Sequence, residues 1–253
     1  MSEAQNLSWS LEAERTCRVR SPWWELVWHP VRGLTEVTFA SGGTPATQGL
    51  VAPEPGNREA KPAQAVSGGA WKAPAILGLS QLRIGDRCWQ FGDLPTAEIV
   101  IQENRVTASW PARPDCPVEL HARWVLEACR FWLEVSLLTP GQVADLALET
   151  VSDLGSCVAF ETPDVHAAVR PALLRPQAVP DWSYLELARA DEVTRVHVSP
   201  SGTVSFRLFD TALEKGVVLR ARLLATFVRR ENEAWLVPQI ARQFAETPPN
   251  LSR

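Results

Sequence analysis

Two consecutive segments of this chain, 118–126 and 130–138, alternate apolar and polar side chains with a period of two residues. Such alternation is typical of β-strands that bury one face and leave the other face polar. The apolar face is formed in the first segment by Val118, Leu120, Ala122, Trp124 and Leu126, and in the second by Phe131, Leu133, Val135 and Leu137. The two segments are therefore predicted to form an antiparallel hairpin.

A two-residue turn at Ala128-Cys129 would set the register of this hairpin, because loop length fixes which residues lie opposite each other. The turn predicts three cross-strand pairs, namely Trp124 with Leu133, Arg123 with Glu134, and His121 with Ser136. In this register apolar residues meet apolar residues and opposite charges meet, so the two faces are consistent.

Strand-like alternation continues through most of the chain, and helix is scarce. Strands are expected at 26–28, 33–39, 79–84, 87–91, 98–101, 105–110, 145–152, 157–160, 184–188, 193–198, 203–209 and 216–228. One helix is predicted over 233–246, where apolar residues follow a 3.6-residue period. The segments 41–74 and 163–180 contain many prolines and no periodicity, so they are expected to be irregular.

These elements predict an all-β fold, a large antiparallel β-sandwich with long loops and a short C-terminal helix. No shift in composition marks a linker, so a single domain over 1–253 is expected, with 41–74 as its long irregular loop.

The composition argues against several classes of partner and location. The net charge of -4 argues against nucleic acid or an anionic membrane, because both need a basic face. No apolar run approaches the roughly 18 residues of a membrane span, and the N-terminus lacks the apolar region of a secretory signal. Five cysteines without a CxxC spacing predict reduced, packed thiols, and therefore a cytoplasmic location.

Established catalytic motifs are absent from the sequence, including GxSxG, HExxH, GxGxxG and the Walker loop. The four histidines are far apart and form no HxH or HxxxH pair. We therefore expect neither a cofactor nor a metal site.

The polar face of the 118–138 hairpin gathers residues with the chemistry of a ligand site, namely His121, Arg123, Trp132 and Glu134. An indole can stack on a pyranose ring, arginine and glutamate can bond hydroxyl groups, and histidine can move a proton near neutral pH. The alternative is a solvated face on which Arg123 and Glu134 form a cross-strand ion pair, since antiparallel sheets usually have one wet face.

Eleven tryptophans accompany a single tyrosine in this chain. Trp124 lies on the apolar face of its strand and is predicted to be core, as are Trp89 and Trp110 at strand ends. Two tryptophans are left as candidate ligand contacts, Trp132 on the polar face and Trp71 in the long loop. For Trp71 the alternative is an anchor that holds the loop in place.

Three stretches between 118 and 154, Trp124-Val125-Leu126, Leu133–Thr139 and Leu146–Leu154, resemble a segment of the galactose-mutarotase-like (aldose 1-epimerase) superfamily. Arg58, in Asn57-Arg58, is similar to an Asn-Arg pair near the sugar site of that family. The resemblance implies a β-supersandwich with a sugar cleft on a concave face. It also implies a histidine acid and a glutamate base that open and close a sugar hemiacetal.

This chain departs from the family at the catalytic histidine, which would fall near Val151-Ser152. No histidine is found there, and no C-terminal segment clearly supplies the glutamate base. The resemblance therefore carries over the fold more readily than the reaction.

The sequence predicts a carbohydrate-binding protein of mutarotase-like fold, with a small-molecule carbohydrate as its partner. Its candidate binding residues are His121, Arg123, Trp132, Glu134, Trp71 and Arg58. If the chain is an enzyme, the resemblance implies an aldose 1-epimerase-like isomerase that lacks the usual histidine. The alternative is a non-enzymatic β-sandwich module that binds a protein partner or associates with itself through a Trp-bearing surface.

Overall fold

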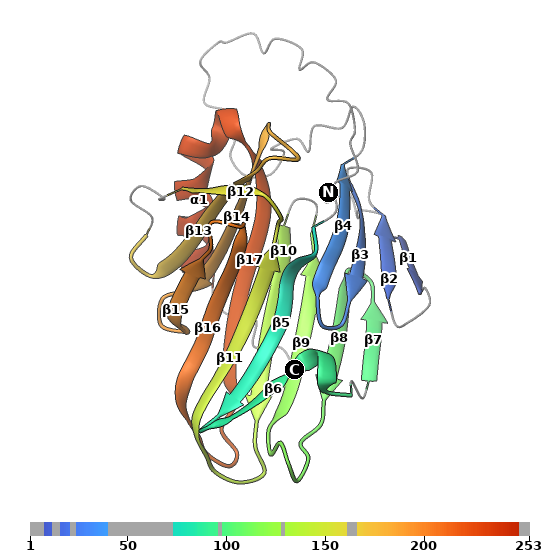
Figure 1. Ribbon diagram of the computed structural model, residues 1–253, viewed down its shortest axis with the longest axis vertical. Helices are drawn as coiled ribbons and strands as arrows, with labels where there is room; N and C mark the ends of the chain where they lie inside the picture. Colours follow the sequence, from blue (N-terminus) through green and yellow to red (C-terminus); the bar gives the residue numbers. More distant parts are fainter. Residues whose placement is uncertain are drawn as a thin grey trace.

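The computed structural model describes residues 8–11, 16–20, 24–39, 73–95, 98–127, 130–160 and 166–247. Two large β-sheets lie one in front of the other (Figure 1). The strands expected from the alternation are all present, with differences at their ends. The predicted all-β sandwich is therefore confirmed.

The first sheet has nine strands, and β5 and β11 lie at its centre. Its order is β1 (Ser8–Leu11), β2 (Cys17–Arg20), β3 (Trp24–His29), β4 (Gly33–Phe39), β5 (Ala75–Ile84), β11 (Val143–Asp153), β16 (Thr203–Leu213) and β15 (Val193–Val198), with β6 (Arg87–Gln90) paired to β5. Its pairs are antiparallel except for a short parallel contact between β4 and β5. The 3-10 turn η2 (Phe91–Asp93) follows β6.

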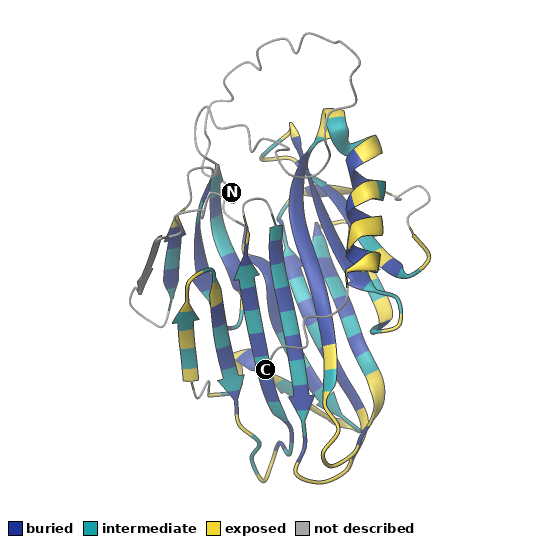
Figure 2. Ribbon diagram, turned by 180° about the vertical axis from the view of Figure 1, so that it is seen from behind, coloured by how far each residue is buried: buried dark blue, intermediate teal, exposed yellow. Residues whose placement is uncertain are grey.

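The second sheet has eight strands, all in antiparallel pairs, and it carries the polar hairpin. Its order is β12 (Cys157–Phe160), β13 (Val169–Pro176), β14 (Trp182–Arg189), β17 (Leu219–Arg229), β10 (Arg130–Leu138), β9 (Glu119–Leu126), β8 (Arg105–Trp110) and β7 (Glu98–Gln102). After the 3-10 turn η3 (Arg230–Asn232), helix α1 (Glu233–Glu246) lies on the outer face of this sheet (Figure 2).

The register of the β9–β10 hairpin is the one that the sequence predicts. Its pairs include Trp124 with Leu133, Arg123 with Glu134, and His121 with Ser136. Burial alternates residue by residue along both strands, so the apolar positions face the other sheet and the polar positions face outward. Ala128-Cys129, where the turn was expected, lies outside the described residues.

Side chains from both sheets form one hydrophobic cluster between them. Trp124 is fully buried and makes an edge-to-face contact with Trp28, with 5.2 Å between ring centroids. Trp110 is buried against Phe91, and Trp89 is partly buried against the same cluster. Trp124 and Trp110 are therefore core residues, as predicted, and Trp89 lies at the margin of the core.

Helix α1 occupies the predicted residues and buries its apolar stripe on the second sheet. A separate cluster forms there between the helix and the outward side chains of β14 and β17. The buried helix residues are Leu236, Val237, Ile240, Ala241 and Phe244. The helix lies against β13, β14 and β17 at one side of the outer face and not over β8 and β9 (Figure 2).

The expectation of an irregular segment over 163–180 is wrong, because Val169–Pro176 forms β13. Prolines disfavour sheet interiors, since they lack the N–H that the ladder needs. Here β12 pairs only with residues 173–176 of β13, so Pro171 lies where β13 has a partner strand on one side alone. The proline is tolerated because this part of the strand is an edge.

Four of the cysteines, Cys17, Cys88, Cys116 and Cys157, lie among the described residues. Cys17, Cys116 and Cys157 are buried, as predicted. The prediction of a packed thiol is wrong for Cys88, which is exposed. Its strand β6 is short and pairs only with β5, so its other side faces solvent.

A polar groove on the outer face of the second sheet

A groove of about 630 Å³ lies on the outer face of the eight-stranded sheet. Its walls come mainly from β8, β9, β10 and β17, with Glu192 contributing from the turn before β15. Three of the predicted residues, His121, Arg123 and Glu134, line this groove together. The polar face of the hairpin is therefore part of a concave surface.

Strand register arranges the polar side chains of the groove in two rows that cross four strands. Each row takes one residue from β8, β9, β10 and β17, in that order. The first row is Thr107, Arg123, Glu134 and Arg222, and the second row is Ser109, His121, Ser136 and Arg220, of which all but Ser109 line the groove. Directly opposite residues in antiparallel strands are close enough for their side chains to interact.

The first row is a chain of alternating charges. Arg123 donates from Nε to Oε2 of Glu134 at 2.6 Å, and its Nη2 contacts the same oxygen. Arg222 lies on the other side of Glu134, and its backbone N–H donates to Glu192 at 2.8 Å. Burial lowers the pKa of Arg222, and the carboxylates of Glu134 and Glu192 oppose that shift. The predicted Arg123–Glu134 ion pair is present, and it holds both groups in place.

The second row is more open to solvent. Nε2 of His121 lies 2.6 Å from Oε1 of Glu119, and both side chains are more than one-third exposed. Arg220 is exposed, and Ser136 is half-buried between His121 and Arg220. Among the described residues, neither Arg220 nor the Ser136 hydroxyl has a hydrogen-bond partner. These groups are therefore available to a ligand.

Trp132 lies on the predicted polar face but does not line the groove. Its ring stacks on Phe244 of α1, with 5.9 Å between centroids and 22° between planes. The Arg222 guanidinium lies 5.0 Å from the Trp132 ring centroid. Phe244 of the helix thus covers the Trp132 indole, and this geometry does not favour the stacking of a sugar on that ring. Trp71 and Arg58 lie outside the described residues.

Sequence reasoning missed the groove residues Arg105, Arg220, Arg222 and Glu192. The alternation along 216–228 indicated that Arg220 and Arg222 share one face of their strand. The sequence did not indicate that β17 is the neighbour of β10, because this pairing joins residues about 90 positions apart.

The position where the resemblance would place a catalytic histidine lies in the other sheet. Val151 and Ser152 belong to β11, at the centre of the nine-stranded sheet. Ser152 points into the core, where it accepts a hydrogen bond from the backbone N–H of Leu77 at 2.9 Å. Val151 points outward, on the same face as Glu149, which accepts a hydrogen bond from Gln81. The groove and this position are therefore on opposite sides of the sandwich.

Among the described residues, no group of three or more His, Cys, Asp or Glu side chains is arranged to hold a metal ion. No helix in the described part of the chain is long and apolar enough to cross a membrane.

Two large antiparallel sheets packed face to face, with a polar groove on one outer face, define a β-supersandwich protein. The fold is that of galactose mutarotase-like proteins. A Klebsiella pneumoniae protein assigned as an aldose 1-epimerase superposes with a TM-score of 0.52 over 97% of this chain and 91% of its own, at 9% identity.

A human-microbiome protein assigned as a kojibiose phosphorylase superposes with a TM-score of 0.50 at 8% identity. The match covers 73% of this chain and 27% of that protein, so this chain corresponds to a minor part of it. No protein-family model and no curated protein sequence matches this chain. The likeness therefore shows the fold and leaves the reaction open.

Proposed function

We propose that this protein binds a carbohydrate in the groove between β8 and β17. The observation that carries the proposal is the pair of polar rows that line a concavity of about 630 Å³. Small-molecule sites usually have volumes of about 300–1,000 Å³ and a few fixed polar groups. A monosaccharide or disaccharide has the size and the polarity to fill such a groove.

The groups in the groove suit hydroxyl ligands, because a sugar hydroxyl both donates and accepts hydrogen bonds. Arg123 and Arg220 offer donors, Glu134 offers acceptor positions, and the Ser136 hydroxyl offers both. The Arg123–Glu134 ion pair fixes these two side chains before a ligand arrives. A prearranged site loses less conformational entropy on binding. The two proteins of similar fold described above have names that refer to sugar chemistry, and this likeness of fold supports the proposal as an analogy.

Ser136→Phe tests the location of the site, since it places a ring at the centre of the second row. Ser205→Phe is the matched control, because Ser205 is a half-buried serine on the outer face of the nine-stranded sheet and pairs with Val151. Calorimetric titration with hexoses, sugar phosphates and oligosaccharides should show saturable binding that S136F abolishes and S205F retains.

The opposite pattern, with binding lost only in S205F, would move the site to the nine-stranded sheet. Absence of saturable binding by the wild-type chain across the whole panel would overturn the carbohydrate proposal.

A more specific form of this proposal is that the protein is a sugar epimerase. Hemiacetal opening needs one group that gives a proton to the ring oxygen and one that takes the hydroxyl proton. His121 is the one histidine that lines the groove, and Glu134 is held by Arg123. Polarimetry of freshly dissolved galactose should show faster mutarotation with the wild-type chain than with His121→Gln. A wild-type rate equal to that in buffer alone would restrict the protein to binding, and equal acceleration by both chains would exclude His121 as the proton donor.

A further inference from the structure

We infer that the ligand of the groove is an anionic sugar, one that carries a phosphate or a carboxylate, and that Arg220 binds the anionic group. This inference rests on the proposed carbohydrate site and specifies the class of ligand. It is carried by the balance of charges in the groove and by the position of one arginine whose side chain has no partner among the described residues.

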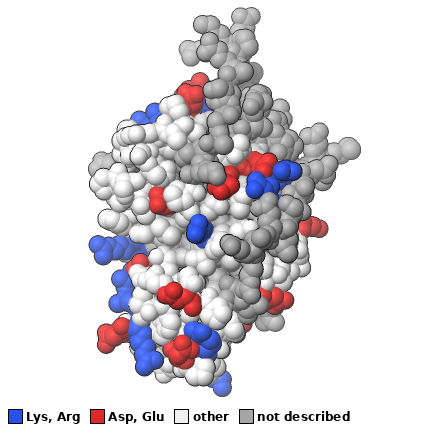
Figure 3. Space-filling view, turned by 45° about the vertical axis from the view of Figure 1, so that its right-hand side comes forward, with Lys and Arg blue, Asp and Glu red and all other residues white. Residues whose placement is uncertain are grey.

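The groove has an excess of positive charge, although the whole chain has a net charge of -4. Four guanidinium groups and two carboxylates line it, namely Arg105, Arg123, Arg220, Arg222, Glu134 and Glu192. On the face shown in Figure 3, acidic and basic side chains are instead interspersed. An excess of one sign in a concave site attracts ligands of the opposite sign.

The two carboxylates are already engaged. Glu134 is paired with Arg123, and Glu192 accepts the backbone N–H of Arg222 and lies 3.8 Å from Arg189. The charge that remains uncompensated therefore belongs to other arginines in the groove.

Arg105 and Arg220 have no carboxylate partner among the described residues. Arg105 donates to the neutral amide oxygen of Gln102, at 3.1 Å from Nε and 2.7 Å from Nη2. Arg220 is exposed, and its side chain makes no hydrogen bond or ion pair within the described part of the chain. Of the two, Arg220 is the one whose donors are all available.

Arg220 lies beside two further groups that can contact an anion. It is opposite Ser136, which is opposite His121. A planar guanidinium matches two oxygens of a phosphate or carboxylate, and the serine hydroxyl can donate to another oxygen. At the other end of the row the carboxylate of Glu119 lies 2.6 Å from His121, so that end is less favourable for an anion. The anionic group is therefore placed between Arg220 and Ser136, with the sugar ring directed toward Arg123 and Glu134.

Calorimetric titration of the full chain at low ionic strength tests this inference, with glucose, glucose 6-phosphate and glucuronate as probes. At least one anionic sugar should bind about tenfold more tightly than glucose, because charge-assisted hydrogen bonds are stronger than neutral ones. The advantage should shrink in 0.5 M NaCl, since salt screens exposed charges. A preference for one anionic probe identifies the anion as phosphate or carboxylate.

Arg220→Gln should weaken binding of the preferred anionic sugar by about tenfold, because the charge-assisted contacts to its anionic group are lost. Arg195→Gln is the matched control, because Arg195 is an exposed arginine on β15 of the other sheet and its loss changes the net charge equally.

Glucose binding as tightly as both anionic sugars would overturn the inference and leave the carbohydrate proposal standing. An equal effect of R195Q and R220Q would also overturn it, since net charge alone would then explain the preference. Failure of all three sugars to bind would also overturn the inference, and the carbohydrate proposal itself falls if the whole panel described above fails to bind.

Discussion

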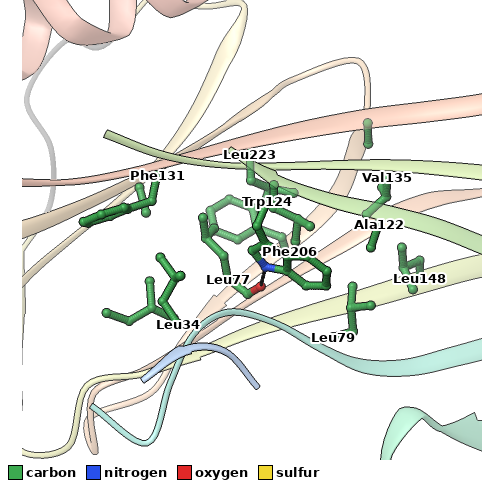
Figure 4. Packing of buried hydrophobic residues seen from close by; sticks show 14 of the residues in the cluster. Leu34, Leu77, Leu79, Ala122, Trp124, Phe131, Val135, Leu148, Phe206 and Leu223 are labelled. Atoms are coloured by element: carbon green, nitrogen blue, oxygen red, sulfur yellow. Dashed lines mark hydrogen bonds between the residues drawn. The ribbon is translucent and has the colours of Figure 1, made fainter. Parts of the chain in front are cut away.

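The indole N–H of Trp124 donates a hydrogen bond of 2.9 Å to the backbone carbonyl of Leu77, from one sheet to the other (Figure 4). Leu77 has a left-handed backbone, with φ of 52°, which interrupts the ladder of β5. Its N–H donates to Ser152 at 2.9 Å, so side chains satisfy both of its backbone groups. Buried backbone groups need such partners, and the irregular point of β5 is therefore held by Trp124 and Ser152.

Trp124→Phe should destabilise the protein by about 2–4 kcal/mol, because it leaves a buried carbonyl without a partner and opens a small cavity. Urea unfolding measures the loss. The control is Trp235→Phe, whose indole also donates a hydrogen bond but is 44% exposed. Its expected cost is within about 0.5 kcal/mol. Similar losses in the two variants would contradict a special role for the Trp124–Leu77 bond.

Gly33→Ala should be among the most damaging small substitutions in the chain. A Cβ at this position would lie 2.2 Å from the carbonyl oxygen of Ile76 and 2.5 Å from that of Leu77, and its φ is +69°. Backbone atoms of β5 would have to move, at a cost of about 3 kcal/mol or more. Gly85→Ala has a similar φ of +56° but no atom within 4 Å, so strain alone should cost about 1–2 kcal/mol. Equal melting temperatures for the two variants would refute the steric argument.

The periodic pattern of the sequence was sufficient to predict local pairing. It predicted that Arg123 faces Glu134, because a register shift of one residue would turn apolar side chains to solvent. The same pattern could not predict which distant strands are neighbours, so the contribution of Arg220 to the groove was missed. The covering of Trp132 by Phe244 was missed for the same reason, since it depends on where the helix docks.

The sequence pattern also could not predict where the backbone departs from regular strand geometry. Leu77 lies outside the strand expected over 79–84, and nothing in the sequence indicates its left-handed conformation, in which Trp124 and Ser152 bind its backbone. Strand β13 was not predicted because prolines are typical of loops. Its prolines are compatible with a strand because β12 pairs with only part of β13, which the sequence does not show.

A carboxyl group lies between the two sheets at Glu186, which is fully buried. Tyr184 donates its hydroxyl hydrogen to Oε2 of Glu186 at 2.6 Å, and Oε1 has no hydrogen-bond partner among the described residues. Burial without a cationic partner raises the pKa of Glu186 from 4.5 to about 7. The folded protein therefore keeps this proton to a higher pH than the unfolded chain does.

Stability should consequently fall as the pH rises from about 4.5 to above 7, because the folded state binds more protons over that range. Glu186→Gln should remove most of this dependence, the rest coming from Glu192, whose pKa burial also raises, and should stabilise the protein by about 2–4 kcal/mol at pH 8 relative to wild type. Urea unfolding at several pH values measures it, with the exposed carboxylate variant Glu98→Gln as the control. A wild-type slope that persists in E186Q would assign the dependence to other groups.

Trp132→Phe should leave ligand affinity within about twofold of wild type, because the indole stacks on Phe244 and does not line the groove. Its Nε1 is buried and has no hydrogen-bond partner among the described residues, so phenylalanine removes an unpaired donor and keeps an aromatic ring against the helix. The two effects offset, and the free energy of unfolding should change by about 1 kcal/mol or less. Calorimetric titration of W132F beside S136F checks the prediction. A tenfold loss of affinity in W132F, with unchanged stability, would place the indole in the ligand site.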